Sequence, residues 1–230
     1  MDDFSITDQT LTDALEQLRT VNQFLGGYAT TMSVLAPWLR SQSSRSVRIL
    51  DLGTGIGDFP EYIVRWVHQR HLPIGLEVVG IDANPFTVSY AQQALERRLP
   101  PELRPQIKLE VADALDLPYS EGSFDVVICA MFLHHFGEDR AVRIVRSMAR
   151  VAKWGILIND LHRHPLAYYG IYSLSRLFRA STMVQHDGPI SVLRGFRRGE
   201  LAQIAQKAAL TDPKISWHFP FRWCLTTLKS

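Results

Sequence analysis

The sequence has little of three features that would each indicate a particular class of protein. Two of its 230 residues are cysteines, Cys129 and Cys224, so a disulfide framework is not expected and a reducing cytoplasm is the predicted compartment. The longest apolar runs, such as residues 126–133, are far shorter than the ~20 residues that span a membrane. The start, Met1-Asp2-Asp3, is acidic with no apolar core behind it, so no signal peptide is expected.

An excess of charge of one sign is also missing. The chain has 25 Lys and Arg residues against 23 Asp and Glu residues, a net charge of +2. Arginines do cluster, at Arg143, Arg146 and Arg150 and again in 194–198, but a solvated helix face and a basic loop explain them. A nucleic-acid partner is therefore not expected.

The chain divides at a polar linker, residues 41–46. Before it, Leu11, Leu15, Leu18, Val21 and Leu25 recur at helical spacing, and a second helix is predicted at about 28–39. These two helices predict an N-terminal helical cap over residues 1–45. The main domain would then span 46–230, with a lid-like insertion at about 161–198.

Beyond the linker, short apolar runs alternate with helical stretches. Strands are predicted at 47–52, 76–81, 107–111, 124–130 and 155–158, with helices at 59–69, 85–98 and 139–151 between them. Later segments are predicted as a helix at 165–179, a loop at 182–194, a helix at 199–209 and two strands, 214–219 and 221–228, separated by Pro220. The pattern predicts an α/β fold, a Rossmann-like, seven-stranded, mostly parallel sheet with helices on both faces and an antiparallel C-terminal hairpin.

A glycine-rich segment, Asp51-Leu52-Gly53-Thr54-Gly55-Ile56-Gly57, follows the first strand. Glycines there let the backbone turn tightly and approach a ligand closely. The dinucleotide pattern has glycines at positions one, three and six, whereas here they occupy one, three and five. Asp51 would repel a pyrophosphate but would favour a cofactor that carries an ammonium group and no phosphate.

Two further acids follow the next strands. Asp82 ends the second strand and can accept hydrogen bonds from ribose hydroxyls, while Asp113 follows the third and can accept one from an adenine amino group. With the glycine segment and the strand from Phe124 to Cys129, these residues resemble the class I S-adenosylmethionine-dependent methyltransferases over about residues 47–158. The resemblance places Asp51 by the methionine part of S-adenosylmethionine, Asp82 by its ribose and Asp113 by its adenine. The full set of predicted cofactor contacts is Asp51, Gly53, Thr54, Gly55, Gly57, Asp82, Ala83, Asp113, Ala114 and Cys129.

The segment from Met131 to Phe136 resembles the Leu-His-His stretch of quinone-biosynthesis and related small-molecule methyltransferases. It does not resemble the Asn/Asp-Pro-Pro-Tyr loop of enzymes that methylate amino groups of bases. Residues 159–164 and 186–194 resemble bacterial methyltransferases of polyketide and phenolic-lipid pathways. That resemblance implies O-methylation of a phenol or a polyketide-derived hydroxyl. We expect a soluble enzyme whose acceptor is small and apolar or aromatic.

A histidine near the acceptor would suit a phenol, which has a pKa near 10 and reacts as phenolate. The predicted candidates for this base are His162, His186 and His135, whereas His134 is expected at a helix start or on the surface. The predicted acceptor contacts are Phe132, Asp160, Tyr169 and Arg194, and Asp160 would either orient a histidine or cap the following helix. No convergent set of acids indicates a metal ion.

Other interpretations remain open from the sequence. Carbon methylation of a quinone-like ring is the second choice for the reaction, and nitrogen methylation is the third. Outside this enzyme class, a nicotinamide-dependent oxidoreductase or a binding module that has lost catalysis would carry a similar fold. The sequence determines neither the identity of the acceptor nor the oligomeric state.

Overall fold

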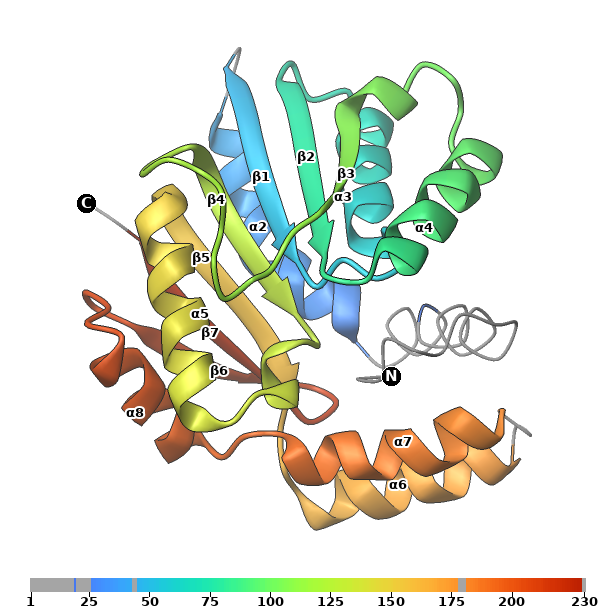
Figure 1. Ribbon diagram of the computed structural model, residues 1–230, viewed down its shortest axis with the longest axis vertical. Coiled ribbons are helices and arrows are strands. Elements are labelled where there is room, and N and C mark those ends of the chain that lie inside the picture. The colour runs from blue at the N-terminus through green and yellow to red at the C-terminus, as the bar shows by residue number, and fades with distance from the viewer. Residues whose placement is uncertain (1–18, 20–25, 43–44, 178–180, 229–230) are drawn as a thin grey trace.

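The computed structural model describes residues 19, 26–42, 45–177 and 181–228, and its centre is a seven-stranded sheet in the order β3-β2-β1-β4-β5-β7-β6 (Figure 1). Strands β1 to β5 are parallel, whereas β7 runs antiparallel to both β5 and β6. The strands are β1 Ser46–Leu52, β2 Gly75–Asp82, β3 Ile107–Val111, β4 Phe124–Ala130, β5 Ala152–Leu161, β6 Lys214–His218 and β7 Arg222–Leu228. The predicted mostly parallel sheet with an antiparallel C-terminal pair is confirmed.

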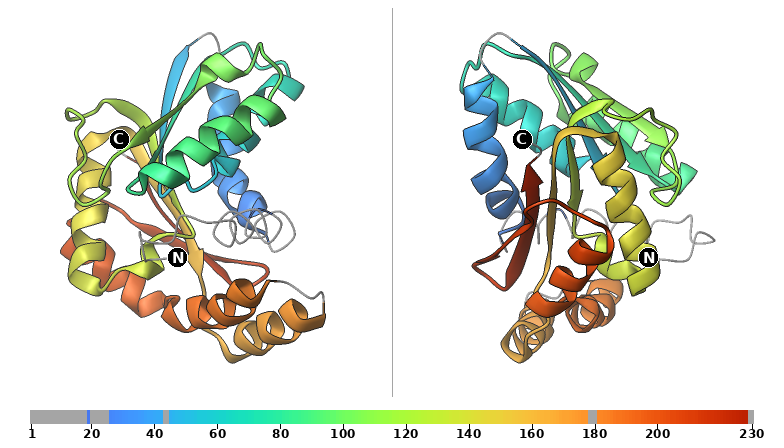
Figure 2. Two further views of the ribbon diagram at one scale, coloured as in Figure 1. Left: turned by 45° about the vertical axis from the view of Figure 1, so that its right-hand side comes forward. Right: turned by 90° about the vertical axis from the view of Figure 1, so that its left-hand side faces the viewer.

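Helices cover both faces of this sheet (Figure 2). The helices α2 Gly27–Ser41, α3 Asp58–Gln69 and α4 Pro85–Arg98 share one hydrophobic core, and α5 Glu138–Val151 and α8 Arg198–Lys207 share the other. In α5 the buried residues recur every three or four positions, from Ala141 through Val145 to Met148, which is the spacing of one helix face. The central strands are buried on both faces, as their nearly continuous apolar sequences require.

Part of the N-terminal prediction falls on residues that the structure describes. The predicted helix at 28–39 is confirmed as α2, which packs on the α3 side of the sheet. The predicted helix from Leu11 to Leu25 lies, apart from Arg19, outside the described residues. The division into a cap at 1–45 and a domain at 46–230 therefore stays a prediction.

The segment after β5 forms two paired helices, α6 Pro165–Leu177 and α7 Thr182–Arg194, beyond the carboxyl ends of β4 and β5 (Figure 1). The prediction of a loop at 182–194 is wrong. Ser181 caps the start of α7 by accepting a hydrogen bond from the Val184 amide, and Val184 and Val192 are buried. Gly188 allows α6 to approach, because a Cβ there would lie 3.1 Å from Ile171. Packing on α6 thus outweighs the turn preference of Asp187-Gly188-Pro189.

The order of the strands reverses beside β1. The chain passes from β1 to β2 and β3 on one side, and then returns to β4 and β5 on the other. The segments that follow β1 and β4 therefore lead to helices on opposite faces of the sheet. In open α/β sheets this is the point at which ligands bind.

Candidate active site

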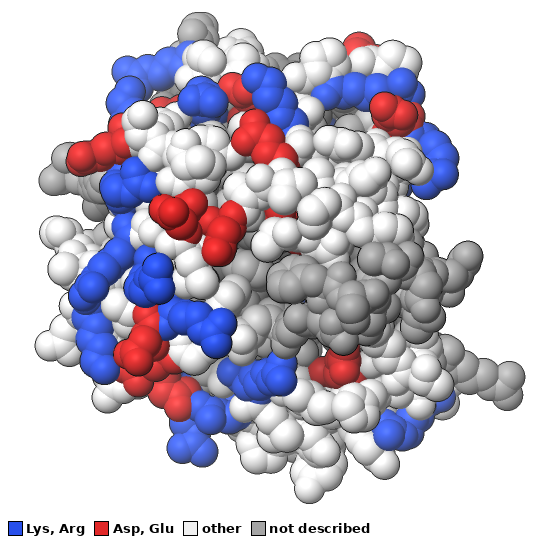
Figure 3. All heavy atoms as spheres, viewed as in Figure 1, with Lys and Arg blue, Asp and Glu red and all other residues white. Residues whose placement is uncertain are grey.

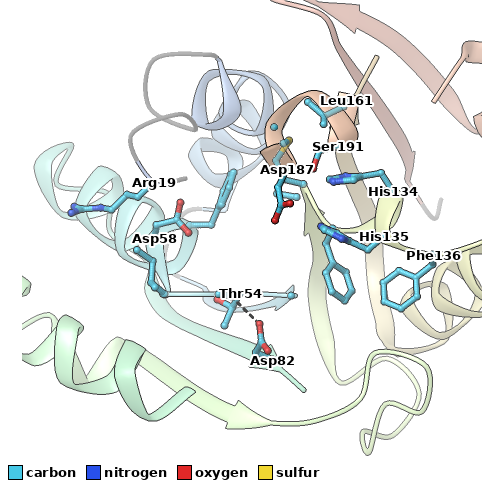
Figure 4. A pocket seen from close by; sticks show the side chains of 18 of the residues that line it. Arg19, Thr54, Asp58, Asp82, His134, His135, Phe136, Leu161, Asp187 and Ser191 are labelled. Atoms are coloured by element: carbon cyan, nitrogen blue, oxygen red, sulfur yellow. Dashed lines mark hydrogen bonds between the residues drawn. The ribbon is translucent and has the colours of Figure 1, made fainter. Parts of the chain in front are cut away.

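A cavity of about 1130 Å³ lies at the carboxyl ends of the central strands (Figure 4). Its walls come from the loops after β1, β2, β3 and β4, from α6 and α7, and from the start of β7. In Figure 4, Thr54 and Asp82 mark one side of this cavity, and His134, His135 and Asp187 mark another. Because both sides open into one cavity, two ligands can meet there.

The glycine segment after β1 lines the first side through backbone conformations that other residues rarely adopt. Gly53, Gly55 and Gly57 have φ angles of 66°, 52° and 70°. A Cβ on Gly53 would lie only 2.3 Å from the ring of Phe132, so this turn also depends on a close approach of the next loop. The turn is fixed by the amide of Thr54, which donates to the carbonyl of Ile81 at 2.9 Å.

Carboxyl groups converge on the same side. Asp51 is fully buried, and its Oδ2 has no hydrogen-bond partner among the described residues. Burial, together with the nearby charges of Asp58 and Asp82, raises the pKa of Asp51 to about 8. Asp58 accepts a hydrogen bond from Tyr28 at 2.8 Å and also lines the cavity. A cation in this place would satisfy Asp51 and reduce the repulsion between the three acids.

Asp82 is held in place at the end of β2. Its carboxylate accepts hydrogen bonds from the amides of Asn84 at 2.9 Å and Gly55 at 3.3 Å. Burial raises its pKa, although these backbone hydrogen bonds oppose the effect. A carboxylate has lone pairs for further donors, so Asp82 can still accept hydrogen bonds from ribose hydroxyls. Beyond it, the turn at Asp113, in which Oδ1 accepts from the Leu115 amide at 2.8 Å, forms the end of the cavity with Ala114.

The other side of the cavity combines apolar walls with a few polar groups. The apolar lining from the paired helices α6 and α7 consists of Leu166, Ala167, Gly170, Ile171, Leu174, Met183, Val184 and Val192. Polar groups come from η2 (Leu133–His135), from Asp187 and Ser191 of α7 and from Arg222 of β7. Arg222 is 1% exposed, and burial lowers its pKa to about 10, although the charge of Asp160 raises it.

One histidine in this region is fixed by a buried carboxylate. His134 Nδ1 lies 2.7 Å from Oδ1 of Asp160, and the His134 amide donates to Oδ2 at 3.1 Å. Both side chains are almost completely buried, and His134 borders the cavity. Of the two predicted places for His134, a helix start or the surface, the first agrees with its position in η2, Leu133–His135, and the second is wrong, since the loop after β4 folds over the end of β5.

Comparisons with known proteins agree with this geometry. A family model described as a methyltransferase domain matches residues 49–155. The demethylmenaquinone methyltransferase of Roseiflexus sp. (strain RS-1) is 35% identical over 147 residues, which cover 62% of this chain and 52% of that protein. The norajmaline N-methyltransferase of Rauvolfia serpentina is 27% identical over 125 residues, covering 53% and 39%.

A solved structure shows the same fold over the full chain. It is the magnesium protoporphyrin IX methyltransferase of Synechocystis PCC 6803 with bound S-adenosylmethionine. The TM-score is 0.61 at 16% identity, with 100% of this chain and 98% of that chain covered.

Residues 49–155 therefore form a class I S-adenosylmethionine-dependent methyltransferase domain. The predicted family, enzyme class and cofactor are confirmed. The chain spans about half or less of the length of the two relatives above, so the activity of the complete protein and its acceptor remain proposals.

The methyltransferase domain brings most of the predicted cofactor residues to one side of the cavity. Those that line it are Asp51, Gly53, Thr54, Gly55, Asp82, Ala83, Asp113 and Ala114. Gly57 and Cys129 do not line it. Gly57 begins α3 and packs against Leu95, and Cys129 is fully buried within β4.

Some of the predicted acceptor and base residues line the cavity and others do not. Phe132 and His135 line the cavity, whereas Tyr169 on α6 is 65% exposed and does not. His186 and Arg194 on α7 also lie on the outside. Tyr169, His186 and Arg194 face away from the cavity because α6 and α7 pair with each other and present other sides to it.

Two further predicted residues lie behind the cavity wall. His162 is half-buried and accepts a hydrogen bond from Trp217 at 3.2 Å. Asp160 is fully buried beneath His134, so of the two roles considered for it the structure places it as the carboxylate that orients a histidine.

Sequence reasoning missed Arg222 and the location of His134. Arg222 follows cis-Pro220 and Phe221 at the start of β7, and nothing in a strand-like run distinguishes a cavity residue from a solvent-facing one. Within the part of the chain that is described, no group of three or more His, Cys, Asp or Glu side chains is arranged to hold a metal ion. No described helix combines the length and apolar character needed to cross a membrane.

Proposed function

We propose that this protein transfers the methyl group of S-adenosylmethionine to the hydroxyl oxygen of a small phenolic acceptor. The observation that carries the proposal is the single cavity, in which a side rich in carboxyl groups meets a side walled by apolar residues. Its volume of about 1130 Å³ exceeds the roughly 300–1,000 Å³ of most single-ligand sites, so cofactor and acceptor fit together.

The chain's own residues fit the cofactor. The ammonium group would pair with Asp51, whose buried Oδ2 otherwise lacks a partner among the residues that the structure describes. Asp82 would hold the ribose and the turn at Asp113 and Ala114 the adenine. When bound, the cofactor supplies an already activated methyl group, so the protein has mainly to align the acceptor with it, which is worth roughly 7–11 kcal/mol.

The groups around the cavity favour an aromatic hydroxyl as the acceptor. The walls of α6 and α7 suit an apolar ring, and Phe132 and Phe136 add aromatic surface beside it. His134, His135 and Arg222 provide groups that can remove a proton or stabilise an anion where the two sides meet. Lys and Arg side chains on the face in Figure 3 are interspersed with Asp and Glu, which does not favour a polyanionic partner.

Carbon methylation of a quinone-like ring is the second candidate. The similarity to a demethylmenaquinone methyltransferase favours it, and an apolar ring would occupy the same cavity. Both reactions begin from a phenolate, so the cavity alone does not separate them. Nitrogen methylation has the support of the alkaloid N-methyltransferase relative.

Product analysis tests the proposal. The protein is incubated with S-adenosylmethionine carrying a ¹³C-labelled methyl group and with a panel of phenols, hydroquinones and anilines. A methoxy signal in the products is expected, and an aryl-methyl or N-methyl signal instead would replace the proposal with the second or third reaction. Failure of S-adenosylhomocysteine to raise the melting temperature would contradict the cofactor site itself. The Asp82→Ala variant is the matched control, because it alters only the cofactor side.

A further inference from the structure

The pair of His134 and Asp160 has the features of a general base with its orienting carboxylate, and the sequence had pointed to other histidines. We propose that His134 Nε2 accepts the proton of the acceptor hydroxyl during methyl transfer, with Asp160 as its positioning residue. This assignment rests on the proposed O-methylation and names the group that would make the hydroxyl reactive. The geometry at the adjacent ends of β4 and β5 supports it.

The pair is rigid because the backbone builds it. Residues Ala130 and Asn159 are partners in the β4–β5 register, and the Met131 amide donates to the Asn159 carbonyl at 2.8 Å. This pairing sets the loop after β4 directly over Asp160. The carboxylate of Asp160 then accepts hydrogen bonds from the amides of Leu161 at 2.7 Å and His134 at 3.1 Å. The carboxylate of Asp160 therefore cannot turn away without breaking hydrogen bonds to the backbone.

The contact with Asp160 fixes which ring nitrogen carries the proton. Both oxygens of Asp160 accept hydrogen bonds from backbone amides, those of Leu161 and His134. Burial raises the pKa of Asp160, but its hydrogen bonds and the contact with His134 outweigh burial and lower it below the ordinary value, so the group is a carboxylate. A carboxylate only accepts hydrogen bonds, so Nδ1 of His134 must be the donor at 2.7 Å. In the neutral ring Nε2 then keeps its lone pair.

That lone pair belongs to a side chain at the wall of the cavity. Nε2 of His134 is buried and has no hydrogen-bond partner among the described residues, although His134 borders the cavity. A buried polar atom without a partner is unfavourable unless a ligand completes it. An acceptor hydroxyl in the cavity would supply that missing donor.

Charged and titratable groups lie on each of the elements that surround this histidine. They are His135 on the same turn, with ring centroids 4.3 Å apart, Asp160 on β5, Arg222 on β7, Asp187 on α7, Arg140 on α5 and the buried thiol of Cys129 on β4. Asp160 and Asp187 favour the imidazolium that forms when His134 takes a proton, while Arg222 and Arg140 favour a phenolate. The surroundings therefore hold charges of both signs for the two products of proton transfer.

The proposed step balances. His134 Nε2 takes the hydroxyl proton, and an oxygen lone pair forms the bond to the methyl carbon. The carbon–sulfur bond breaks with its electron pair left on sulfur, so the sulfonium becomes a neutral thioether. The imidazolium then returns its proton to solvent water. No oxidant, reductant or metal is needed.

The first test compares His134→Gln with the wild-type protein on phenols of graded acidity. At neutral pH, an acceptor of pKa near 10 should lose about 100-fold or more in kcat, since general bases contribute about 10²–10⁴-fold. A nitro-substituted phenol that is already ionised should lose less than about tenfold. The Kd for S-adenosylhomocysteine should stay within about twofold. An equal loss on all phenols would mean that His134 is structural and would overturn the assignment.

His135→Gln is the matched control, because this neighbour lines the same cavity from the same turn, η2. It should lose less activity than His134→Gln, and its loss should not depend on the acidity of the phenol. If His135→Gln instead shows the larger, acidity-dependent loss, His135 is the base and the proposal is wrong.

A second readout does not need turnover. ¹⁵N spectra of the imidazoles, assigned by the signal missing in His134→Gln, should show His134 protonated on Nδ1 in the wild type. Asp160→Asn, which can donate to Nδ1, should move that proton to Nε2 while the protein stays folded. A wild-type proton on Nε2 would overturn the assignment even if no phenol proves to be a substrate. Absence of turnover on phenols with the Nδ1 tautomer in place would count against the proposed acceptor alone.

Discussion

The two ends of the cavity are built in different ways. The cofactor end consists of short loops that each follow directly on a strand, after β1, β2 and β3, and its polar groups are carboxylates and backbone amides. The acceptor end is assembled from η2, α6, α7 and β7, with apolar walls and a small number of cationic or titratable groups. One of its contacts, between Arg222 and Met131, joins residues 91 positions apart.

This difference shows which forces fix each end. At the cofactor end, glycine backbone angles and strand register determine where Asp51 and Asp82 lie, so a few consecutive residues suffice. At the acceptor end, the shape depends on how distant helices pack against each other. A protein built in this way can change its acceptor by altering α6 and α7 while its cofactor site is unchanged.

The largest effect is expected at Gly53, where the two ends touch. In Gly53→Ala the new Cβ would lie 2.3 Å from Phe132, at a φ of 66° that favours glycine. Crowding and backbone strain together should lower the free energy of unfolding by about 2–4 kcal/mol. Urea denaturation measures this difference, and cofactor affinity should fall with it.

Two glycines separate the causes of that loss. Gly122 has a φ of 64° but nothing within 4 Å of its Cβ position, so Gly122→Ala should show the strain alone, about 1 kcal/mol. Gly137 has neither feature, and Gly137→Ala should stay within about 0.5 kcal/mol. If Gly53→Ala costs no more than Gly122→Ala, the two ends of the cavity do not constrain each other.

Asp82→Ala should weaken only the cofactor end. Losing the hydrogen bonds to a charged acceptor costs about 1.5–3 kcal/mol, which raises the Kd for S-adenosylhomocysteine by roughly 10- to 150-fold. Titration calorimetry measures this Kd. Leu174→Ala, on the acceptor wall, is the matched variant and should leave this Kd within about twofold. An unchanged Kd in Asp82→Ala would remove Asp82 from the cofactor site.

Asp51 should make the cofactor end sensitive to pH. Its folded pKa is raised to about 8, so the ligand-free protein binds a proton there that the unfolded chain releases near pH 4. The stabilising effect of this proton is complete below about pH 4 and is lost as the pH rises to 8. Cofactor binding should instead become stronger as the pH rises, because an ammonium group interacts more favourably with the ionised carboxylate of Asp51 than with its protonated form.

We therefore expect affinity for S-adenosylhomocysteine to rise with pH between 6 and 8, by at most about tenfold per unit. Calorimetry in buffers of different ionisation enthalpy measures the number of protons released when S-adenosylhomocysteine binds. We expect a value close to one, from the carboxyl group of Asp51. Asp51→Asn should bind more weakly and lose this dependence. If the variant keeps the same slope, another group accounts for the linkage.

The sequence was informative where neighbouring residues carry the structure. The glycine segment and Asp51 could be identified because they are contiguous and follow a strand, and Asp82 could be placed by the end of the next strand. The burial of His134 was not predicted because it depends on the β4–β5 register, which pairs Ala130 with Asn159. No local pattern specifies that pairing.

The α6–α7 segment was the hardest to predict for the same reason. Asp187, Gly188 and Pro189 favour a turn in isolation, yet in the folded chain they belong to a helix. The sides of α6 and α7 that face the cavity follow from their mutual packing, which the sequence alone does not reveal. Tyr169 was therefore expected at the acceptor, although it lies on the exposed side of α6.

The smallest effect is expected for Tyr169, and it tests which side of α6 meets the acceptor. Tyr169→Ala should change KM by less than about twofold, because the side chain is 65% exposed and lies off the cavity. Ile171→Ala removes a cavity-lining side chain two residues away and should raise KM about tenfold, since lost apolar contact in a pocket costs about 1–3 kcal/mol. The reverse ranking would mean that the acceptor binds the outer side of α6, because a helix cannot present both residues to one ligand. The apolar wall of the cavity would then belong to protein packing, and the contrast between the two ends would not hold.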